Sequence, residues 1–354
     1  MDKIIFFKIN GLNLWNGGVN YIKQLKVSLI AESIDLVVII NDFDKEGIKR
    51  LEDSSVDYRV IETNKYFKFL NLFLLKLGVS FSSIKEHKEN KKPIKIIYHG
   101  LIPVRYIFSK HRTIYWLPDI LHEIYPSNFS KSHYYKRLIF TNFNLKITNE
   151  LLLSSYSIKK QLKKIYKIKK KIIVYQFSST INRVSDLSLN FTKPLVLVPH
   201  EFWSHKRQEK IVNLANNNSD YIFILTGNNR INQKNSSFNK FNSELKFLKN
   251  NNLLNLGEID WVFLNQLYLE AEYIGNLSDY EGWNTSVEIA KFLNKKLILS
   301  KIDVHEEQAE GYDKVVWLRD NVKLPKVLGN KSNYSYEDEI SKRIKHLCKD
   351  LYPY

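Results

Sequence analysis

Short apolar runs recur along the first half of the chain and alternate with segments whose apolar residues follow a helical period. The runs that predict strands are 4–9, 36–41, 58–62, 94–99, 113–117, 145–147 and 172–176. The segments that predict helices lie near 19–31, 65–78, 132–140 and 157–167. Continuous apolar strands that alternate with helices are typical of a doubly wound parallel sheet.

The second half repeats this pattern after a polar stretch, 177–193, that is rich in Ser and Asn and has the composition of a linker. Its predicted strands are 195–199, 221–225, 253–256, 273–276, 297–300 and 315–318. Its predicted helices lie near 206–215, 236–250, 261–271, 285–293 and 336–350. The pattern predicts an α/β protein with two Rossmann-like domains, whose ligands bind beyond the carboxyl ends of the strands. We assign 1–180 to the first domain, 181–330 to the second, and 331–354 to a C-terminal helix for which packing on the first domain is one option.

Length and composition agree with this division. The chain has 354 residues, which is more than a single hydrophobic core usually serves, and 44% of them are apolar. A lone cysteine, Cys348, excludes an internal disulfide and favours the reducing cytoplasm. The first apolar run is too short for a membrane span or a signal peptide, so we expect a buried strand there.

Positive charge is concentrated in the first half of the chain. Residues 1–180 contain 31 Lys and Arg against 15 Asp and Glu, whereas the remaining residues contain 23 and 22. This asymmetry favours an anionic partner for the first half, although a Lys-rich soluble surface explains it equally well. The Phe- and Leu-rich stretch 66–81 and the eight lysines of 157–171 fit an anionic membrane surface or, more plainly, a buried and a solvated helix. Nucleic acid is less favoured because no aromatic–basic recognition motif accompanies the lysines.

The stretch DYEGWNTSVEIA at 279–290 carries the clearest chemical signal. The carboxylate of Glu281 is followed by Gly282 and then by small polar residues that can cap a helix. Free N–H groups at a helix N-terminus attract phosphate, and a nearby carboxylate can bind sugar hydroxyls. The stretch therefore predicts a site for a phosphorylated sugar.

Motifs in this order resemble retaining glycosyltransferases of the GT-B fold, family 4, of the type that builds bacterial surface polysaccharide. The resemblance runs from near the first strand to about residue 308. It is carried by GGVNYIKQL (17–25), WLPDILHEIYPSNFS (116–130), LLLSSYSIKKQL (151–162), LVPHEFWSHKRQEKIV (197–212), ILTG (224–227), LNLGEI (254–259), DYEGWNTSVEIA (279–290) and NKKLILSKIDVHEEQ (294–308). It implies two Rossmann-like domains that face each other across a cleft.

The resemblance also implies roles for particular residues. Glu281 would act on the donor sugar, with His122 and Asp119 as candidate catalytic or acceptor-contacting residues and His99 as a weaker alternative. The implied donor-binding residues are His200, Lys206, Arg207, Gly227, Gly282, Trp283, Asn284, Thr285 and Glu288. Gly17 and Gly18 would form a loop that lets the backbone approach an acceptor or a phosphate.

Two positions depart from the family pattern. The second Glu of the motif is expected eight residues after Glu281, where this chain has Ile289, and the nearest carboxylate is Glu288. Thr285 and Glu288 have the spacing of a capping box, which favours a structural role for Glu288 over ribose binding. His200 stands where the family has a diphosphate-binding Arg, and Arg207 is close enough in sequence to compensate.

The sequence therefore predicts a retaining transferase that moves a hexose from a nucleotide sugar to a glycan acceptor, expected to be lipid-linked, in O-antigen or capsule synthesis. We expect a cytoplasmic enzyme on the inner face of the plasma membrane. We expect no metal or cofactor: Asp42 and Asp44 imitate an Asp-x-Asp motif, but a turn explains them better. The alternatives are a catalytically impaired GT-B partner protein, suggested by Ile289 and His200, and a basic nucleic-acid-binding protein.

Overall fold

The computed structural model describes residues 3–9, 16–42, 44–53, 55–61, 95–100, 111–181, 183, 188–228, 236–325 and 334–352. The chain forms two compact units. Unit 1 comprises Met1–Phe177 together with Glu339–Tyr354, and unit 2 comprises Ser178–Asp338. The helix expected at 65–78 and the apolar, Lys-containing stretch 66–81 lie outside the described residues.

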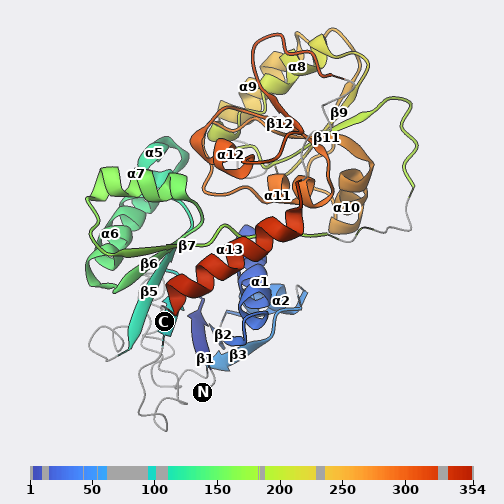
Figure 1. Ribbon diagram of the computed structural model, residues 1–354. Helices are drawn as coiled ribbons and strands as arrows, with labels where there is room; N and C mark the ends of the chain where they lie inside the picture. The colour runs from blue at the N-terminus through green and yellow to red at the C-terminus, as the bar shows by residue number, and fades with distance from the viewer. Residues whose placement is uncertain are drawn as a thin grey trace. The chain divides into compact units, whose positions relative to one another are not determined.

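In the described part of unit 1, seven parallel strands form one sheet in the order β3-β2-β1-β4-β5-β6-β7 (Figure 1). The strands are β1 Lys3–Lys8, β2 Ile34–Asn41, β3 Tyr58–Ile61, β4 Lys95–Tyr98, β5 Arg112–Leu117, β6 Glu150–Leu153 and β7 Lys171–Val174. The helices are α1 Asn16–Ile30, α2 Lys45–Asp53, α5 Leu121–Ile124, the 3-10 turn Pro126–Asn128, α6 Lys131–Ile147, α7 Tyr156–Tyr166 and α13 Tyr336–Leu351.

One predicted strand of unit 1 is wrong. Residues 145–147 are the last turn of α6, which continues well past the predicted end at 140. Leu145 is buried on the same side of α6 as Thr141 and Asn144, so its apolar character serves the helix and not a strand. The strand follows a short turn at Thr148 and is β6, whose four residues are all buried.

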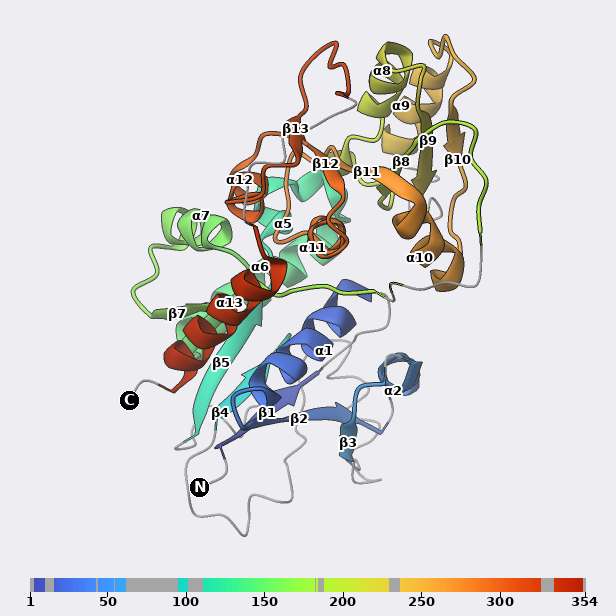
Figure 2. The same cartoon turned by 45° about the vertical axis from the view of Figure 1, so that its right-hand side comes forward.

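In the described part of unit 2, six parallel strands form a second sheet in the order β10-β9-β8-β11-β12-β13 (Figure 2). The strands are β8 Leu195–Pro199, β9 Ile222–Thr226, β10 Leu253–Asn255, β11 Ala271–Asn276, β12 Lys296–Leu299 and β13 Val315–Trp317. The helices are the 3-10 turn Ser204–Lys206, α8 Lys210–Asn217, α9 Ser236–Leu245, α10 Trp261–Glu270, α11 Thr285–Phe292 and α12 Asp303–Gln308.

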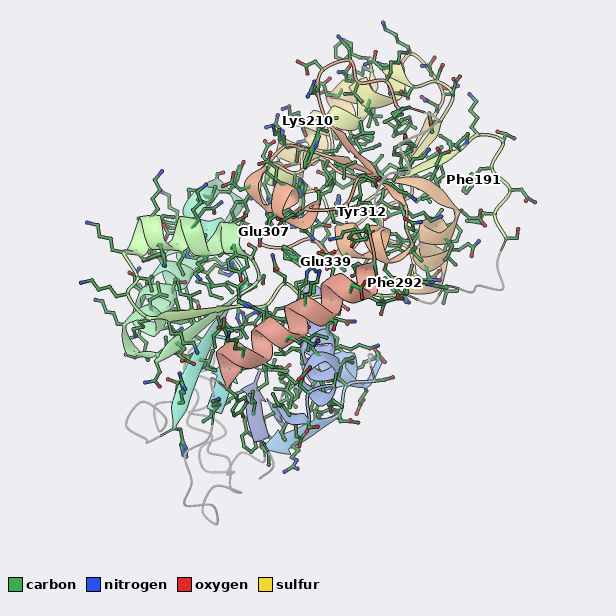
Figure 3. All side chains as sticks on the ribbon, in the orientation of Figure 1. Phe191, Lys210, Phe292, Glu307, Tyr312 and Glu339 are labelled. Carbon is green, nitrogen blue, oxygen red and sulfur yellow. The ribbon has the colours of Figure 1, made fainter. Side chains whose placement is uncertain are left out.

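Each face of this second sheet has its own apolar core. On one face, Leu197 and Ile274 pack with Val287 and Ile289 of α11 and with Tyr312, which Figure 3 labels. On the other face, residues of β8 and β9 pack with the apolar sides of α8 and α9. The second sheet is thus buried between helices, and the predicted α/β class with two parallel sheets is confirmed.

The chain returns to unit 1 within α13. The side chain of Arg343 donates a hydrogen bond to the carbonyl oxygen of Gln176 at 3.4 Å, and the side chain of Lys95 donates to the carbonyl oxygen of Leu351. The ring of His346 lies 2.9 Å from the hydroxyl of Tyr156 on α7. Within the described ranges, no helix is long and apolar enough to cross a membrane.

Candidate functional site

The candidate site of unit 2 lies at the carboxyl ends of β8 and β11, which are neighbours in the sheet. The chain continues from β8 to α8 on one face of the sheet and from β11 to α11 on the other. The two loops therefore leave adjacent strand ends toward opposite faces of the sheet. Ligands of open α/β sheets bind in the crevice between two such loops. The topology by itself therefore brings the loop after residue 199 next to the loop after residue 276.

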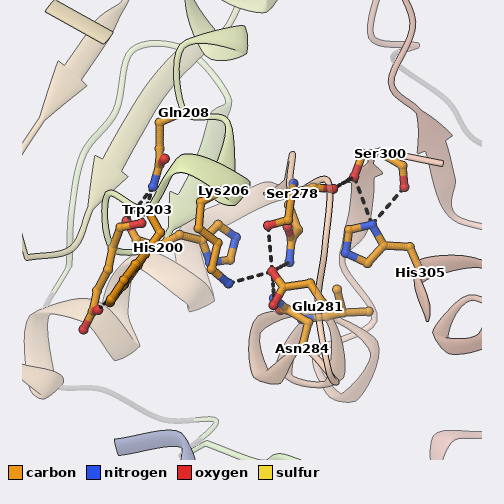
Figure 4. A network of polar contacts seen from close by, with 12 residues as sticks. His200, Trp203, Lys206, Gln208, Ser278, Glu281, Asn284, Ser300 and His305 are labelled. Carbon is orange, nitrogen blue, oxygen red and sulfur yellow. Dashed lines mark hydrogen bonds and ion pairs between the residues drawn. The ribbon is translucent and has the colours of Figure 1, made fainter. Parts of the chain in front are cut away.

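Glu281 is the centre of this site (Figure 4). Among the described residues, four side-chain donors converge on its Oε1 atom: Lys206 Nζ at 2.6 Å, Ser278 Oγ at 2.6 Å, Asn284 Nδ2 at 3.1 Å and Asn276 Nδ2 at 3.2 Å. Within the same residues, no hydrogen bond reaches Oε2. One carboxylate oxygen fixes the side chain, and the other has its lone pairs available to a ligand.

The environment keeps Glu281 ionised. Its side chain is only 8% exposed, and burial alone would raise the pKa of the carboxyl group. The charge and hydrogen bond of Lys206, together with smaller contributions from His205 and His200, outweigh burial and hold the pKa of Glu281 well below its usual range. The site therefore presents a fixed negative charge beside a fixed positive charge.

Lys206 is positioned by a turn and not by a helix, which corrects the predicted helix at 206–215. It ends the 3-10 turn Ser204–Lys206, and α8 begins only at Lys210. Arg207 between them has a left-handed backbone with φ of 53°, which breaks the helix. The backbone N–H of Asp279 donates to the carbonyl oxygen of His205 at 2.7 Å, so the turn is joined to the Glu281 loop.

Arg207 has acidic partners within the unit. Its Nε atom donates to Glu209 at 2.6 Å, and its Nη1 atom donates to Asp279 at 2.8 Å. Lys210, which is labelled in Figure 3, donates to the other carboxylate oxygen of Asp279 at 2.9 Å. These ion pairs hold the guanidinium group in place at the edge of the site.

His200 is buried and neutral. Burial, reinforced by the charge of Lys206, lowers its pKa to about 3. Its Nε2 atom lies 3.1 Å from the carbonyl oxygen of Gly275, so that nitrogen carries the proton. His200 thus provides no positive charge where the resembled family has an Arg.

Gly227 lies against the backbone of His200 at the end of β9. A Cβ atom on Gly227 would stand 2.3 Å from the carbonyl oxygen of His200, and its φ is +132°. Only glycine satisfies both conditions. The N–H of Gly227 donates to the carbonyl oxygen of Gly257 at 2.7 Å, which aligns the ends of β9 and β10.

The capping box predicted for Thr285 and Glu288 is wrong. The N-cap residue of α11 is Asn284, whose Oδ1 atom accepts a hydrogen bond from the N–H of Val287 at 3.1 Å. Thr285 is therefore the first helical residue, and Glu288 lies one position beyond that of a capping-box Glu. Asn284 has two roles, since its amide nitrogen also donates to Glu281.

Glu288 is fully buried, and both of its oxygens are engaged. Oε1 accepts from Gln308 Nε2 at 3.0 Å, and Oε2 lies 3.1 Å from the hydroxyl of Tyr336. The neighbouring Ile289 is 1% exposed and packs in the core beneath α11. Trp283 is buried beside the cap, whereas Gly282 and Thr285 are partly exposed.

Sequence analysis did not single out several residues of this site. His305 and Gln308 come from α12, a short helix that we did not predict, although the matched segment 294–308 contains both. Gln308 links the backbone of Asn284 to Glu288, while His305 bonds Ser300 through Nδ1. Burial lowers the pKa of His305 to about 4, and its Nε2 atom is buried without a partner in the described structure.

The candidate residues of unit 1 gather near the ends of β4 and β5. His122 is buried, with its Nε2 atom 3.7 Å from Glu123, and burial lowers its pKa. Asp119 accepts a hydrogen bond from the N–H of Leu121 at 2.9 Å. His99 lies 3.2 Å from the carbonyl oxygen of Trp116, and burial lowers its pKa also.

Gly17 and Gly18, the remaining candidate residues of unit 1, lie in the first turn of α1, as expected for a loop-to-helix junction.

No group of three or more His, Cys, Asp or Glu side chains in the described ranges is arranged to hold a metal ion, and metal independence stays a prediction.

Comparison with known proteins shows the fold. No family model and no curated protein sequence matches the chain. Among solved structures, a glycosyltransferase from Rickettsia africae has a TM-score of 0.63 and 14% identity over 99% of this chain and 89% of its own. Sucrose-phosphate synthase from Thermosynechococcus elongatus has a TM-score of 0.62 and 12% identity over 99% and 90%. The Anabaena protein HepE in complex with UDP-glucose has a TM-score of 0.60 and 13% identity over 98% and 90%.

These neighbours are GT-B glycosyltransferases, and the chain has their α/β fold with two parallel sheets. At such low identity the likeness establishes the fold and not the activity. What the chain does is therefore argued from its own residues.

Proposed function

We propose that the protein is a nucleotide-sugar-dependent glycosyltransferase. The observation that carries the proposal is the pairing of Lys206 with Glu281 at the point where the strand order of unit 2 reverses. A cation suited to a diphosphate and a carboxylate suited to a sugar are hydrogen-bonded to each other at 2.6 Å, so the two groups can contact neighbouring parts of one ligand. The resemblance of the fold to HepE, a protein solved with UDP-glucose, supports this reading.

In the proposed reaction, each residue of unit 2 has a physical task. Lys206 would bind the diphosphate through a charge-assisted hydrogen bond, and the first turn of α11 would offer N–H groups to it. The Oε2 atom of Glu281 would accept hydrogen bonds from the sugar hydroxyls. A carboxylate in this place also favours the oxocarbenium-like charge that develops at the anomeric carbon during a retaining transfer.

The acceptor side of the proposal concerns unit 1. His122 and Asp119 of unit 1 are buried or partly buried polar groups beyond strand ends, where acceptor contacts are expected in a doubly wound domain. The basic excess of the first half supports a lipid-linked glycan of a bacterial surface polysaccharide as acceptor, met at an anionic inner membrane surface. A hexose as the transferred sugar rests on the sequence resemblance, as does independence of metal.

A panel of UDP-, GDP-, dTDP- and CMP-sugars tests the proposal. Calorimetry or thermal shift should show that one nucleotide diphosphate binds, and the matching sugar nucleotide should be consumed slowly even without acceptor. Competition by the nucleoside diphosphate would place both ligands in one site. Absence of binding by every member of the panel would contradict the proposal.

A second candidate is a GT-B partner protein that binds a nucleotide sugar without turning it over. Glu288 and Ile289 favour it, because both are buried and neither presents a carboxylate for a nucleotide ribose. Binding in the panel without any consumption of the sugar nucleotide, with several glycan acceptors present, would favour this candidate. A nucleic-acid partner would show instead as oligonucleotide binding that weakens steeply as salt rises.

A further inference from the structure

Helix α6 of unit 1 exposes an apolar stripe on the side that faces away from its own core. Tyr135, Ile139 and Phe143 are 58%, 62% and 42% exposed. Residues four apart lie on one face of a helix, so the three side chains form a continuous row along α6. Among the described residues, no other helix exposes three large apolar side chains.

The orientation of α6 is fixed by its opposite side. Thr141, Asn144 and Leu145 are buried, and the side-chain amide of Asn144 donates to the carbonyl oxygen of Gly100 at 2.7 Å. A surface helix normally turns its polar face outward. On α6 the outward face carries the largest apolar side chains, and such a patch marks a contact with another apolar phase or protein.

Lysines surround the stripe. Lys131 in the first turn and Lys146 in the last turn lie on nearly the same face as Tyr135, and Lys136 lies at its flank; all three are exposed. The sequence of α6, KSHYYKRLIFTNFNLKI, contains no Asp or Glu. A row of aromatic and aliphatic side chains with lysines at both ends has the chemistry of a helix that lies in a bilayer interface.

Helix α7 extends the positive charge on the same side of the sheet. α6 connects β5 to β6 and α7 connects β6 to β7, and right-handed crossovers in one direction place both helices on one face (Figure 1). Lys160, Lys163 and Lys164 are exposed on α7, which also contains no acidic residue. The charge of this side complements an anionic surface.

We infer that the outward face of α6, with Tyr135, Ile139 and Phe143 inserted and Lys131, Lys136 and Lys146 at the headgroups, docks unit 1 on an anionic lipid bilayer. The link to a lipid-linked acceptor rests on the proposed function. The membrane contact itself rests only on the exposed apolar side chains and lysines of α6. A bilayer is favoured over a protein partner because the stripe is flanked by one sign of charge alone. The excess positive charge of the first half suggested a membrane contact, and the inference places that contact on one face of α6.

The test uses the full-length protein and sedimentation with vesicles of phosphatidylcholine alone or with 30% phosphatidylglycerol. The variant I139S/F143S should reduce binding to the anionic vesicles at least tenfold at both 0.1 M and 0.5 M salt, because it removes the apolar insertion. The variant K136Q/K146Q should reduce binding several-fold at 0.1 M salt and little at 0.5 M, where charge is already screened. Matched controls are W261S/V262S and K246Q/K249Q, whose original side chains are exposed on unit 2.

Equal sedimentation of the I139S/F143S variant and the unchanged protein would overturn the inference, as would equal binding to both kinds of vesicle. A change in oligomeric state of the I139S/F143S variant, with vesicle binding retained, would also overturn it and would make the stripe a protein contact. Nucleoside-diphosphate binding is measured on the same samples. If the unchanged protein binds anionic vesicles through α6 but no nucleotide, the proposed function fails and the docking face stands.

Discussion

The hydroxyl group of Tyr336 lies 3.1 Å from Oε2 of Glu288, across 48 positions of sequence. The same hydroxyl accepts a hydrogen bond from the backbone N–H of Ser179 at 3.1 Å. Tyr336 therefore joins α11, the helix of the Glu281 motif, to the segments at which the chain enters and leaves unit 2. Glu288, one position away from where a ribose ligand is expected, serves this internal connection.

We predict that Tyr336→Phe destabilises unit 2 by about 1–3 kcal/mol, because it leaves a buried carboxylate oxygen short of a donor. Urea unfolding measures the change. Tyr135→Phe, at an exposed position of α6, is the control and should leave the free energy of unfolding unchanged. Equal stability of the two variants would show that the Tyr336–Glu288 contact contributes nothing.

Glu281→Gln should abolish most of the turnover and also lower stability. Turnover should fall on the order of a hundredfold or more, since the variant lacks the charge that favours the transition state. Stability should fall as well, because Glu281 is buried against Lys206. Breaking a buried ion pair costs about 3–5 kcal/mol, and the partial exposure of Lys206 places the cost near the lower end.

The stability lost in Glu281→Gln should depend on pH. The pKa of Glu281 is lowered from its ordinary value of 4.5 in the folded protein, so the unfolded chain binds the proton first as the pH falls. The stabilisation from Glu281 is complete above about pH 5 and decreases at lower pH. Unfolding of both proteins at pH 7 and pH 4 checks this, with Glu310→Gln, at an exposed position, as the control. A constant difference between Glu281→Gln and the unchanged protein would contradict it.

Lys206→Met should weaken the binding of a nucleoside diphosphate by about 1.5–3 kcal/mol, the contribution of a hydrogen bond to a charged group. Methionine keeps the length of the side chain and removes its charge. Lys210→Met is the matched control, because Lys210 is held by Asp279 at the edge of the site. Calorimetric affinities that are the same for Lys206→Met and the unchanged protein would remove Lys206 from the diphosphate site.

His200→Gln should make the protein less sensitive to mild acid. The unfolded chain protonates this histidine near pH 6.5, whereas the folded protein does so only near its pKa of about 3. Stability from the neutral His200 is therefore complete above pH 6.5 and is lost as the pH falls, by up to about 1.4 kcal/mol per pH unit. Between pH 7 and pH 5 the unchanged protein should lose more stability in urea than His200→Gln, whose amide can still donate to Gly275. The same loss in both proteins would mean that His200 is not kept neutral by the fold.

The sequence alone determined the two parallel sheets and the loops that carry the site. Apolar runs without polar alternation indicated buried strands, and helices between them required parallel pairing. Because the carboxyl ends of parallel strands lie at one edge, the loops of Lys206 and Glu281 were placed at the same edge of the sheet. Strand period was sufficient for that, whereas the pairing of β8 with β11, which brings the two side chains to 2.6 Å, comes from the tertiary structure.

Only the tertiary structure decided how individual polar groups are used. The partners of Glu288 are Gln308 and Tyr336, which are 20 and 48 positions away, and no local pattern encodes such contacts. The residues 145–147 and the stripe of α6 show the same limit, since an apolar residue can serve a helix, a strand or an exposed face. The hydrophobic period of a segment depends on residues that are close in sequence. The burial of a side chain and its hydrogen-bond partners depend on residues that are distant in sequence and close in the fold.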